Sequence, residues 1–262
     1  MKRLGRYALR LVGLSYLFVL LALPLGLIFR RAFADGFDAA WEAVTTPAAK
    51  HALVVTLIIA AIAVPANTVF GIICAIAVVR RRFPGKNLVN AIVDLPLALS
   101  PVVVGLAFLL LFGSGGWLAG LPFDVVFALP GMVLATIFVS LPFVVREVVP
   151  VLREIGTEQE QAAATLGAGG WQIFRRVTFP AIRWAVAYGV VLTMARALGE
   201  FGAVSVVSGR LIGKTESLTL HVDERYQSFD YVGAYAASVL LAMLAIATLV
   251  AMTVFKPKEE TR

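Results

Sequence analysis

Two charged residues stand inside an apolar stretch of the chain, where ionised side chains are uncommon. Arg196 and Glu200 lie within the run 184–204 and are four residues apart. In a helix this spacing places both side chains on one face. An ionised group at the centre of a membrane costs about 2.5–3.5 kcal/mol on insertion scales, so such groups pair or face protein or water. The spacing predicts either an ion pair that fixes helix packing or a lining for the route of an anion.

The second of these roles has a definite chemistry. A positive Arg196 attracts a dianion, and Glu200 keeps that attraction from holding the anion permanently, because transport requires weak binding at several sites. Ser100 and Thr193 are candidate hydroxyl donors on the same route. Both roles of the charged pair stay open on the residues alone.

The other reactive residue types do not indicate a catalytic, metal or nucleotide site. A single cysteine, Cys74, excludes an internal disulfide, and the two histidines, His51 and His221, are far apart, so we expect them at surface loops rather than on a metal. Residues 208–215 follow a strand-like run and imitate a phosphate-binding loop, but their glycines enclose three residues where that loop needs four. We predict that the chain is not an enzyme and holds no metal or cofactor.

The composition is that of a membrane protein. Of the 262 residues, 60% are hydrophobic and 15% are charged, and the mean hydropathy is +0.89. Soluble domains carry about 45–50% apolar and about 25% charged residues, and a soluble protein of this size cannot hide so much apolar side chain. An ordinary soluble enzyme and a disordered regulator are therefore excluded. In a membrane protein the net charge of +7 indicates how the helices are oriented, because Lys and Arg concentrate on the cytoplasmic side.

Six apolar runs supply the elements that must position these residues. A helix needs about 20 apolar residues to cross a bilayer, and five runs qualify plainly while one is interrupted by prolines. We predict an all-α integral membrane protein with six transmembrane helices, at 11–29, 52–79, 88–112, 128–152, 184–204 and 232–255. We expect residues 1–29 as an N-terminal segment with the first helix, 52–255 as the transmembrane domain with a cytoplasmic loop at 153–183, and 256–262 as a tail.

The basic residues orient these helices. Sixteen Lys and Arg residues fall on the side of both termini and of the loop 153–183, and six fall on the opposite side. Because Lys and Arg concentrate in cytoplasmic loops, both termini are expected in the cytoplasm, and nucleic acid is not expected as a partner. Ala32-Phe33-Ala34 imitates a signal-peptide cleavage site, but Arg30 and Arg31 interrupt the approach to it, so we expect the first helix to remain.

The cytoplasmic loop is the most specific feature. Thr157 and Glu160 have the spacing of a capping box at the start of a short helix, and Gly167 is placed to end that helix. A second short helix with an exposed Trp171 is expected to stop ahead of Pro180. Two short helices with glycines between them predict a rigid protrusion rather than a simple connector.

The residues of this loop resemble the signature of ABC importer membrane subunits. That signature is Glu-Ala-Ala, three residues, Gly, nine residues, Ile, one residue, Leu-Pro. The chain has the same spacing, with Gln161, Val177 and Phe179 in place of the signature's Glu, Ile and Leu, and it keeps Ala162, Ala163, Gly167 and Pro180. The resemblance implies that Glu160, Gln161, Ala162, Ala163, Gly167, Trp171 and Pro180 dock onto a separate ATP-binding subunit.

Further motifs are similar to the sulfate/thiosulfate branch of this family. They are Asp94-Leu95-Pro96 with residues 99–105, Arg196-Ala197-Leu198-Gly199-Glu200-Phe201-Gly202-Ala203, and the run 219–226, which is more similar to one of the two non-identical permease subunits. The resemblance implies a type I importer fold in a bacterial inner membrane, working by alternating access. It implies as partners two copies of an ATP-binding subunit that holds ATP and Mg²⁺, a second permease subunit, an extracytoplasmic sulfate-binding protein and membrane lipid.

Three other functions remain as alternatives. Molybdate/tungstate permeases share the Gly-Glu-Phe-Gly segment, so that segment does not choose the anion. A secondary transporter needs intramembrane carboxylates to carry a coupling ion, and Glu200 is the clear candidate. A membrane enzyme needs a nucleophile and base or paired metal ligands, and no such pattern stands in the apolar runs. Co-purification of an ATP-binding subunit separates an ABC permease from the secondary transporter and from the membrane enzyme.

Overall fold

The computed structural model describes residues 2–120 and 122–255, and the side chains of 9–120 and 122–251. The expected tail at 256–262 lies outside these residues. The described chain is helical, with π-helical turns η1 and η2 and the following elements: α1 (Lys2–Leu17), η1 (Phe18–Ala22), α2 (Leu23–Ala32), α3 (Phe37–Thr45), α4 (Pro47–Arg80), α5 (Lys86–Ala98), α6 (Pro101–Phe112), α7 (Leu129–Ser140), α8 (Pro142–Glu154), α9 (Glu158–Thr165), α10 (Gly170–Ile173), η2 (Phe174–Thr178), α11 (Phe179–Leu198), α12 (Gly202–Val207), α13 (Leu218–Gln227) and α14 (Tyr231–Phe255).

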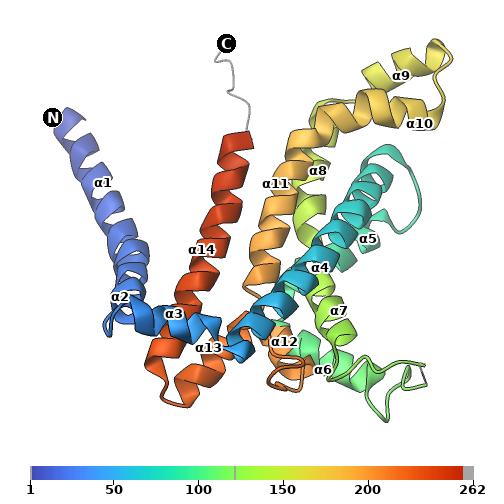
Figure 1. The fold of residues 1–262 in the computed structure, drawn as a ribbon. Coiled ribbons are helices and arrows are strands. Elements are labelled where there is room, and N and C mark those ends of the chain that lie inside the picture. Colours follow the sequence, from blue (N-terminus) through green and yellow to red (C-terminus); the bar gives the residue numbers. More distant parts are fainter. Residues whose placement is uncertain (1, 121, 256–262) are drawn as a thin grey trace.

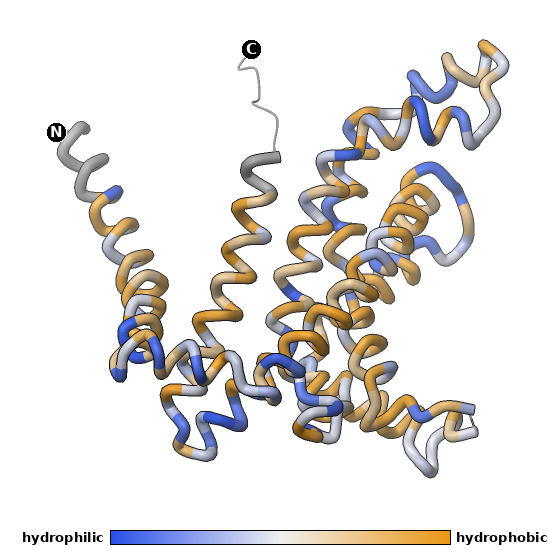
Figure 2. The backbone as a smooth tube through the Cα atoms, in the orientation of Figure 1, coloured by the Kyte–Doolittle hydropathy of each residue, from blue (hydrophilic) through white to orange (hydrophobic). Residues whose placement is uncertain are grey.

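The helices long and apolar enough to cross a membrane match five of the six expected spans. They are Leu9–Ala32, Pro47–Arg80, Leu129–Glu154, Gly170–Leu198 and Tyr231–Ala251. The apolar residues in Figure 2 follow these helices along most of their length, while polar residues gather at the two ends of the bundle. The all-α membrane fold predicted from the sequence is confirmed.

The remaining expected span, 88–112, is not a single straight helix. It consists of α5 and α6, which meet at an angle of 111°. Pro101 opens α6 and forces Ser100 into an extended conformation, because a residue before proline is disfavoured in the helical region. The prolines were expected to kink this run, but the bend is sharp enough that α6 lies across the end of the bundle (Figure 1).

Helices α4, α8 and α11 form the centre of the bundle. Val144 on α8 lies at their meeting point: a Cβ added at Gly71 of α4 would stand 2.6 Å from its Cβ, and one at Gly189 of α11 would stand 2.8 Å from its Cα. Small residues of this kind let membrane helices approach closely, where dispersion contacts replace the hydrophobic drive available in water. Val144 belongs to a core of buried side chains that extends along the three helices and includes Ala75, Val148, Leu152, Ile182 and Val186.

The two ends of the bundle carry different elements. Helices α9 and α10 extend from one end, where α1 begins, α14 ends and α4 turns into α5 (Figure 1). Helices α3, α6, α12 and α13 lie across the other end. The basic loop after Arg80 and the arm of α9 and α10 therefore share one end, as the distribution of basic residues predicts.

Candidate functional site

Two short helices, α9 and α10, form an arm that projects from the bundle (Figure 1). Gly167 follows α9 with φ of +84°, in the left-handed region that glycine adopts without strain. The N–H groups of Gly167 and Ala168 donate to the carbonyls of Ala164 at 3.0 Å and Ala163 at 3.1 Å. These two bonds form a Schellman turn that satisfies the end of the helix. The prediction that Gly167 ends this helix is confirmed.

Glu160 ties the arm to the bundle instead of capping its own helix. Its Oε2 lies 2.9 Å from Nε of Arg80 at the end of α4, and its Oε1 accepts from Nη2 of Arg80 at 3.2 Å. The same Oε1 accepts from Oγ1 of Thr178 at 2.8 Å, and Nη1 of Arg80 donates to the carbonyl of Leu152. The expected capping box is wrong: the Thr157 side chain makes no cap and accepts from Nε2 of Gln161.

The capping box failed because a stronger partner is available. Arg80 and Glu160 are largely buried, with 11% and 19% of their side chains exposed. A carboxylate that faces a guanidinium side by side gains more than one that bonds a neutral backbone N–H. Arg80 and Thr178 were not singled out from the sequence, where Arg80 was one of a run of basic residues that indicated orientation only.

A single continuous helix joins the arm to the bundle. From Gly170 to Leu198 the chain remains helical through α10, the π-helical turn η2 and α11. The prediction that the second helix stops ahead of Pro180 is wrong. Pro180 lies in the first turn of α11 and has no N–H to donate. The turn before it is a wider π-helical one, in which the N–H of Phe179 donates to the carbonyl of Phe174, so the helix continues through the proline.

A groove opens between the two helices of the arm. It encloses about 340 Å³ and is lined by Ala163, Leu166, Gly167, Ala168, Gln172, Ile173, Arg176 and Val177. Leu166 and Trp171 beside it are 89% and 73% exposed. Gln161, Ala162 and Pro180 also face outward. Exposed apolar side chains that border a groove mark a surface for a protein partner.

Arg196 and Glu200 form the expected ion pair, although not on one continuous helix. Nη2 of Arg196 lies 2.8 Å from Oε2 of Glu200, with 34% of the arginine side chain and 1% of the glutamate side chain exposed. Helix α11 ends at Leu198, so the expected span to residue 204 is wrong. Oε1 of Glu200 accepts from the N–H of Ala203 at 2.9 Å, and thus holds the first turn of α12. The run 204–207, which looks strand-like in the sequence, is helical.

Ser100 lies at the other broken helix, and the two breaks pack together. A Cβ added at Gly202 would stand 2.8 Å from Cβ of Pro101, the residue after Ser100. The structure thus brings Ser100 into the neighbourhood of Glu200, with its side chain exposed and making no cap. Thr193 is different: it is fully buried and donates to the carbonyl of Gly189, so it does not face a route.

The loop that imitates a phosphate site is closed on itself. Oγ1 of Thr215 donates to the carbonyl of Ser208, and the N–H of Arg210 donates to Oγ of Ser208 at 3.1 Å. These bonds use the groups that would otherwise face a phosphate. Asp94 pairs with Arg146, with 2.9 Å between its Oδ1 and the Nε of the arginine. The expectation that His221 lies at the surface is wrong, because the turn before α13 covers it and leaves 2% exposed.

The chain is similar to known permeases over nearly its whole length. It is 49% identical to the sulfate transport system permease protein CysW of Synechocystis sp., covering 94% of this chain and 90% of the relative. It is also 49% identical to CysW of Escherichia coli strain K12, covering 94% and 86%, and 43% identical to CysT of the same strain, covering 88% and 86%.

Solved structures share the fold at low sequence identity. A bacterial ABC transporter involved in the import of the acidic polysaccharide alginate matches with a TM-score of 0.80 and 19% identity, covering 96% of this chain and 94% of that chain.

A protein family is also matched directly by the sequence. The family model of the binding-protein-dependent transport system inner membrane component matches residues 67–260. Because the match extends over most of the chain and includes both the arm and the Arg196–Glu200 pair, the chain belongs to this family of inner membrane transport components.

Proposed function

We propose that this chain is one of two permease subunits in an ATP-driven importer that moves sulfate or thiosulfate across the inner membrane. The observation that carries the proposal is the arm, in which a groove with exposed apolar side chains is fixed to the bundle by the Arg80–Glu160–Thr178 contacts. The choice of anion is supported by relatives named as sulfate permeases at 49% identity.

The arm offers a direct mechanical path to the charged pair. The groove is on α9 and α10, and the helix that begins at Gly170 ends two residues before Glu200. The chain thus remains helical from α10 to the break before Glu200, and η2 lies where it turns from the arm into the bundle (Figure 1), so a movement imposed on α10 has a continuous helical path to that break. Glu160 on α9 accepts from Thr178 in η2 and pairs with Arg80 of α4, so α9 is tied both to this helical path and to α4.

The charged pair suits the passage of a dianion. The guanidinium of Arg196 is one-third exposed while its partner carboxylate is buried, so positive charge is the side of the pair that a passing anion meets. The carboxylate of Glu200 weakens the binding of the anion to Arg196. An anion bound to an arginine without a paired carboxylate would leave slowly, and transport requires weak binding. Ser100, exposed at the neighbouring break, supplies a hydroxyl donor.

The importer requires partners that this chain does not contain. Two copies of an ATP-binding subunit would hold ATP and Mg²⁺ and dock on the arm of each permease subunit. A second permease subunit would complete the pore, and an extracytoplasmic sulfate-binding protein would deliver the anion. The first span, Leu9–Ala32, is unburied over its apolar window and so has a free face for lipid or the second permease subunit.

The test is uptake of labelled sulfate by vesicles that contain the full complex. We expect uptake to require ATP inside the vesicles and the binding protein outside, and to be competed by thiosulfate more strongly than by molybdate. Uptake that follows a proton or sodium gradient without ATP would identify a secondary transporter, and preferential uptake of molybdate would assign the chain to the molybdate/tungstate branch.

A further inference from the structure

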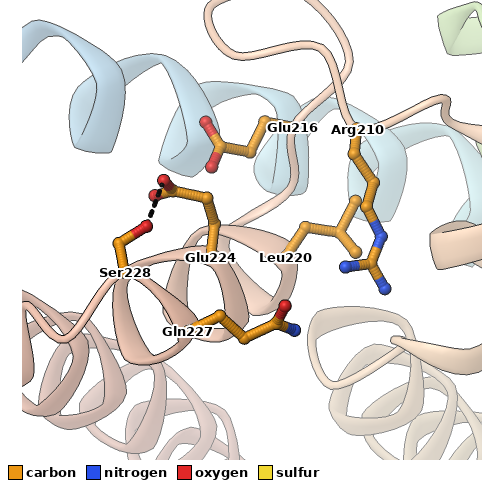
Figure 3. A pocket seen from close by; sticks show the side chains of 6 residues that line it. All are labelled: Arg210, Glu216, Leu220, Glu224, Gln227 and Ser228. Atoms are coloured by element: carbon orange, nitrogen blue, oxygen red, sulfur yellow. Dashed lines mark hydrogen bonds between the residues drawn. The ribbon is translucent and has the colours of Figure 1, made fainter.

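A compact group of potential metal ligands lies at the end of the bundle opposite the arm. Glu216, His221 and Glu224 each offer one ligand atom, and these atoms lie within 4.8 Å of one another. Glu216 precedes α13, while His221 and Glu224 are three residues apart on α13 and so share one face of it. Figure 3 shows the carboxylates of Glu216 and Glu224 turned toward each other.

One carboxylate of this group is buried with an unused oxygen. Glu216 is 2% exposed, and its Oε2 has no hydrogen-bond partner. Its other oxygen, Oε1, lies 3.1 Å from Nδ1 of His221, which is also 2% exposed. The side chain borders a cavity of about 180 Å³ that Glu224 also lines. A buried carboxylate oxygen without a partner is costly, and a cation is one group that satisfies it.

The nearby arginines pair with other carboxylates than that of Glu216. Arg225 lies 3.3 Å from Glu224 and 3.5 Å from Asp230, and Arg210 lies 2.9 Å from Asp223. Among the described side chains the ion pairs of these arginines do not include Glu216. The carboxylate of Glu216 is therefore left without an arginine partner, whereas that of Glu224 is paired with Arg225, and a bound cation would supply the positive charge that is missing beside Glu216.

The backbone that carries these ligands is held firmly. Oγ of Ser217 accepts from the N–H of Leu220 and caps α13, and the N–H of Leu218 donates to Oγ1 of Thr56 on α4 at 2.7 Å. Oγ1 of Thr219 donates to the carbonyl of Glu200 at 2.8 Å. Oγ of Ser228 donates to Oε1 of Glu224 at 3.0 Å and orients that carboxylate. Outer hydrogen bonds of this kind accompany ligands in established metal sites.

We propose that Glu216, His221 and Glu224 bind one divalent transition-metal ion, with Zn²⁺ as the best fit. An imidazole nitrogen with carboxylate oxygens is a donor set that suits Zn²⁺, and three protein ligands leave a fourth position for water. Zn²⁺ ligands stand at about 2.0–2.2 Å from the metal, so the present group needs to contract by about an ångström on binding. The cavity beside Glu216 and Glu224 provides the space for water.

The ion would act as a clip. It would join the turn that precedes α13 to the middle of α13, and through Thr56 and Glu200 this region is bonded to α4 and to the break after α11. The proposed site is separate from the arm and from Arg196, so its existence does not depend on which anion is transported. A structural metal stabilises the fold by the free energy with which the folded state binds it.

The experiment measures metal binding by the full-length chain without a histidine tag, purified in detergent and stripped with a chelator. Titration calorimetry with Zn²⁺ is expected to show one equivalent bound, and Co²⁺ is expected to give the visible absorption of a low-symmetry site. Glu216→Gln and His221→Gln are each expected to weaken binding at least tenfold. His51→Gln changes the other histidine of the chain and is expected to leave binding unchanged.

The outcomes separate a metal site from a simple hydrogen-bonded pair. A wild-type chain that takes up no Zn²⁺ and no Co²⁺ overturns the proposal, as does a Glu216→Gln variant that binds as tightly as the wild type. If either variant fails to fold, the thermal unfolding of the wild type decides: Zn²⁺ is expected to raise its midpoint and Mg²⁺ is not. Equal effects of the two ions would also reject the site.

Discussion

At the scale of single residues, the contacts of Glu160 distinguish this chain from the signature that it resembles. The signature has Glu at the position of Gln161, yet Gln161 is exposed and bonds within its own helix. Glu160, one residue earlier, makes the ion pair to Arg80. A carboxylate next to the signature position thus links the arm to α4.

The Arg80–Glu160 pair is expected to couple the arm to transport. Glu160→Ala leaves a largely buried guanidinium without its partner, and losing one side of such a pair costs about 3–5 kcal/mol when burial is complete. A double-mutant cycle of Arg80→Met and Glu160→Ala is expected to give a coupling energy of about 1–3 kcal/mol in thermal unfolding. ATP-dependent uptake should fall in both single variants. Glu158→Ala, exposed on the same helix, is the control, and a loss of uptake there would contradict this role.

Gly167 is needed for its backbone conformation alone. A Cβ there meets no atom within 4 Å, so the cost of a side chain comes from φ of +84°. For an ordinary residue that cost is about 1–2 kcal/mol, and it is lower for asparagine. Gly167→Val is therefore expected to reduce binding of the ATP-binding subunit about tenfold, since 1.4 kcal/mol is a factor of ten. Pull-down titration should rank Gly167→Asn between Val and the wild type, and equal binding by all three would reject the argument.

Removing the charged pair tests the anion route. Arg196→Leu/Glu200→Gln keeps an acceptor oxygen for the N–H of Ala203 while it removes both charges. We expect this variant to assemble with its partners, because exchanging a buried pair for neutral groups is often nearly neutral in stability. We expect its sulfate uptake to fall at least tenfold while ATP hydrolysis continues. Normal uptake would leave the pair with a packing role only.

At the scale of elements, the breaks in helices were the features that hydropathy could not locate. The apolar run 184–204 reads as one span, yet α11 ends at Leu198 and α12 begins at Gly202. Gly105 of α6 allows the close approach that follows, because a Cβ there would stand 2.8 Å from the carbonyl oxygen of Ala203. Conversely, Pro180 reads as a helix end, yet the helix passes through it.

The arm is expected to depend on Trp171 for its partner. Trp171 is 73% exposed and its ring lies 5.4 Å from that of Phe174, so it presents a supported apolar surface. Large aromatic residues at the centre of an interface typically cost about 2 kcal/mol or more when truncated. Trp171→Ala is expected to weaken binding of the ATP-binding subunit at least tenfold in a pull-down titration. Trp117 is 95% exposed in the loop that follows α6, the helix that lies across the opposite end of the bundle (Figure 1), so Trp117→Ala should have no effect on that binding.

At the scale of the whole molecule, the chain has two chemically distinct ends. The arm and the basic loop after Arg80 lie at one end, and α3, α12 and α13 lie at the other (Figure 1). The excess of Lys and Arg predicts that the end with the arm faces the cytoplasm.

Cysteine labelling tests this orientation directly. The native Cys74 is buried, so it contributes little background. Gln172→Cys is expected to react with a membrane-impermeant maleimide only in inverted vesicles, and Lys214→Cys only in intact cells, because both positions are exposed at opposite ends. Trp117→Cys should follow Lys214→Cys. Reaction of positions 172 and 214 from the same side would overturn the orientation.

The membrane class, the apolar runs and the position of the arm could all be predicted from the amino-acid sequence. These depend on local quantities, since the length of an apolar run and the conformation of Gly167 are set by the residues themselves. The Arg196–Glu200 pair was also visible, because its partners are four residues apart.

The contacts between residues far apart in the sequence could not be predicted in this way and became visible in the folded chain. The carboxylate of Glu160 pairs with Arg80, which is 80 residues earlier in the chain, and does not cap the terminus of its own helix. His221 was covered by the turn that contains Glu216, and α5 and α6 bent by 111° where two helix breaks pack together. Each outcome follows from close approach between segments far apart in sequence, where burial and charge pairing outweigh the local preferences that a linear pattern records.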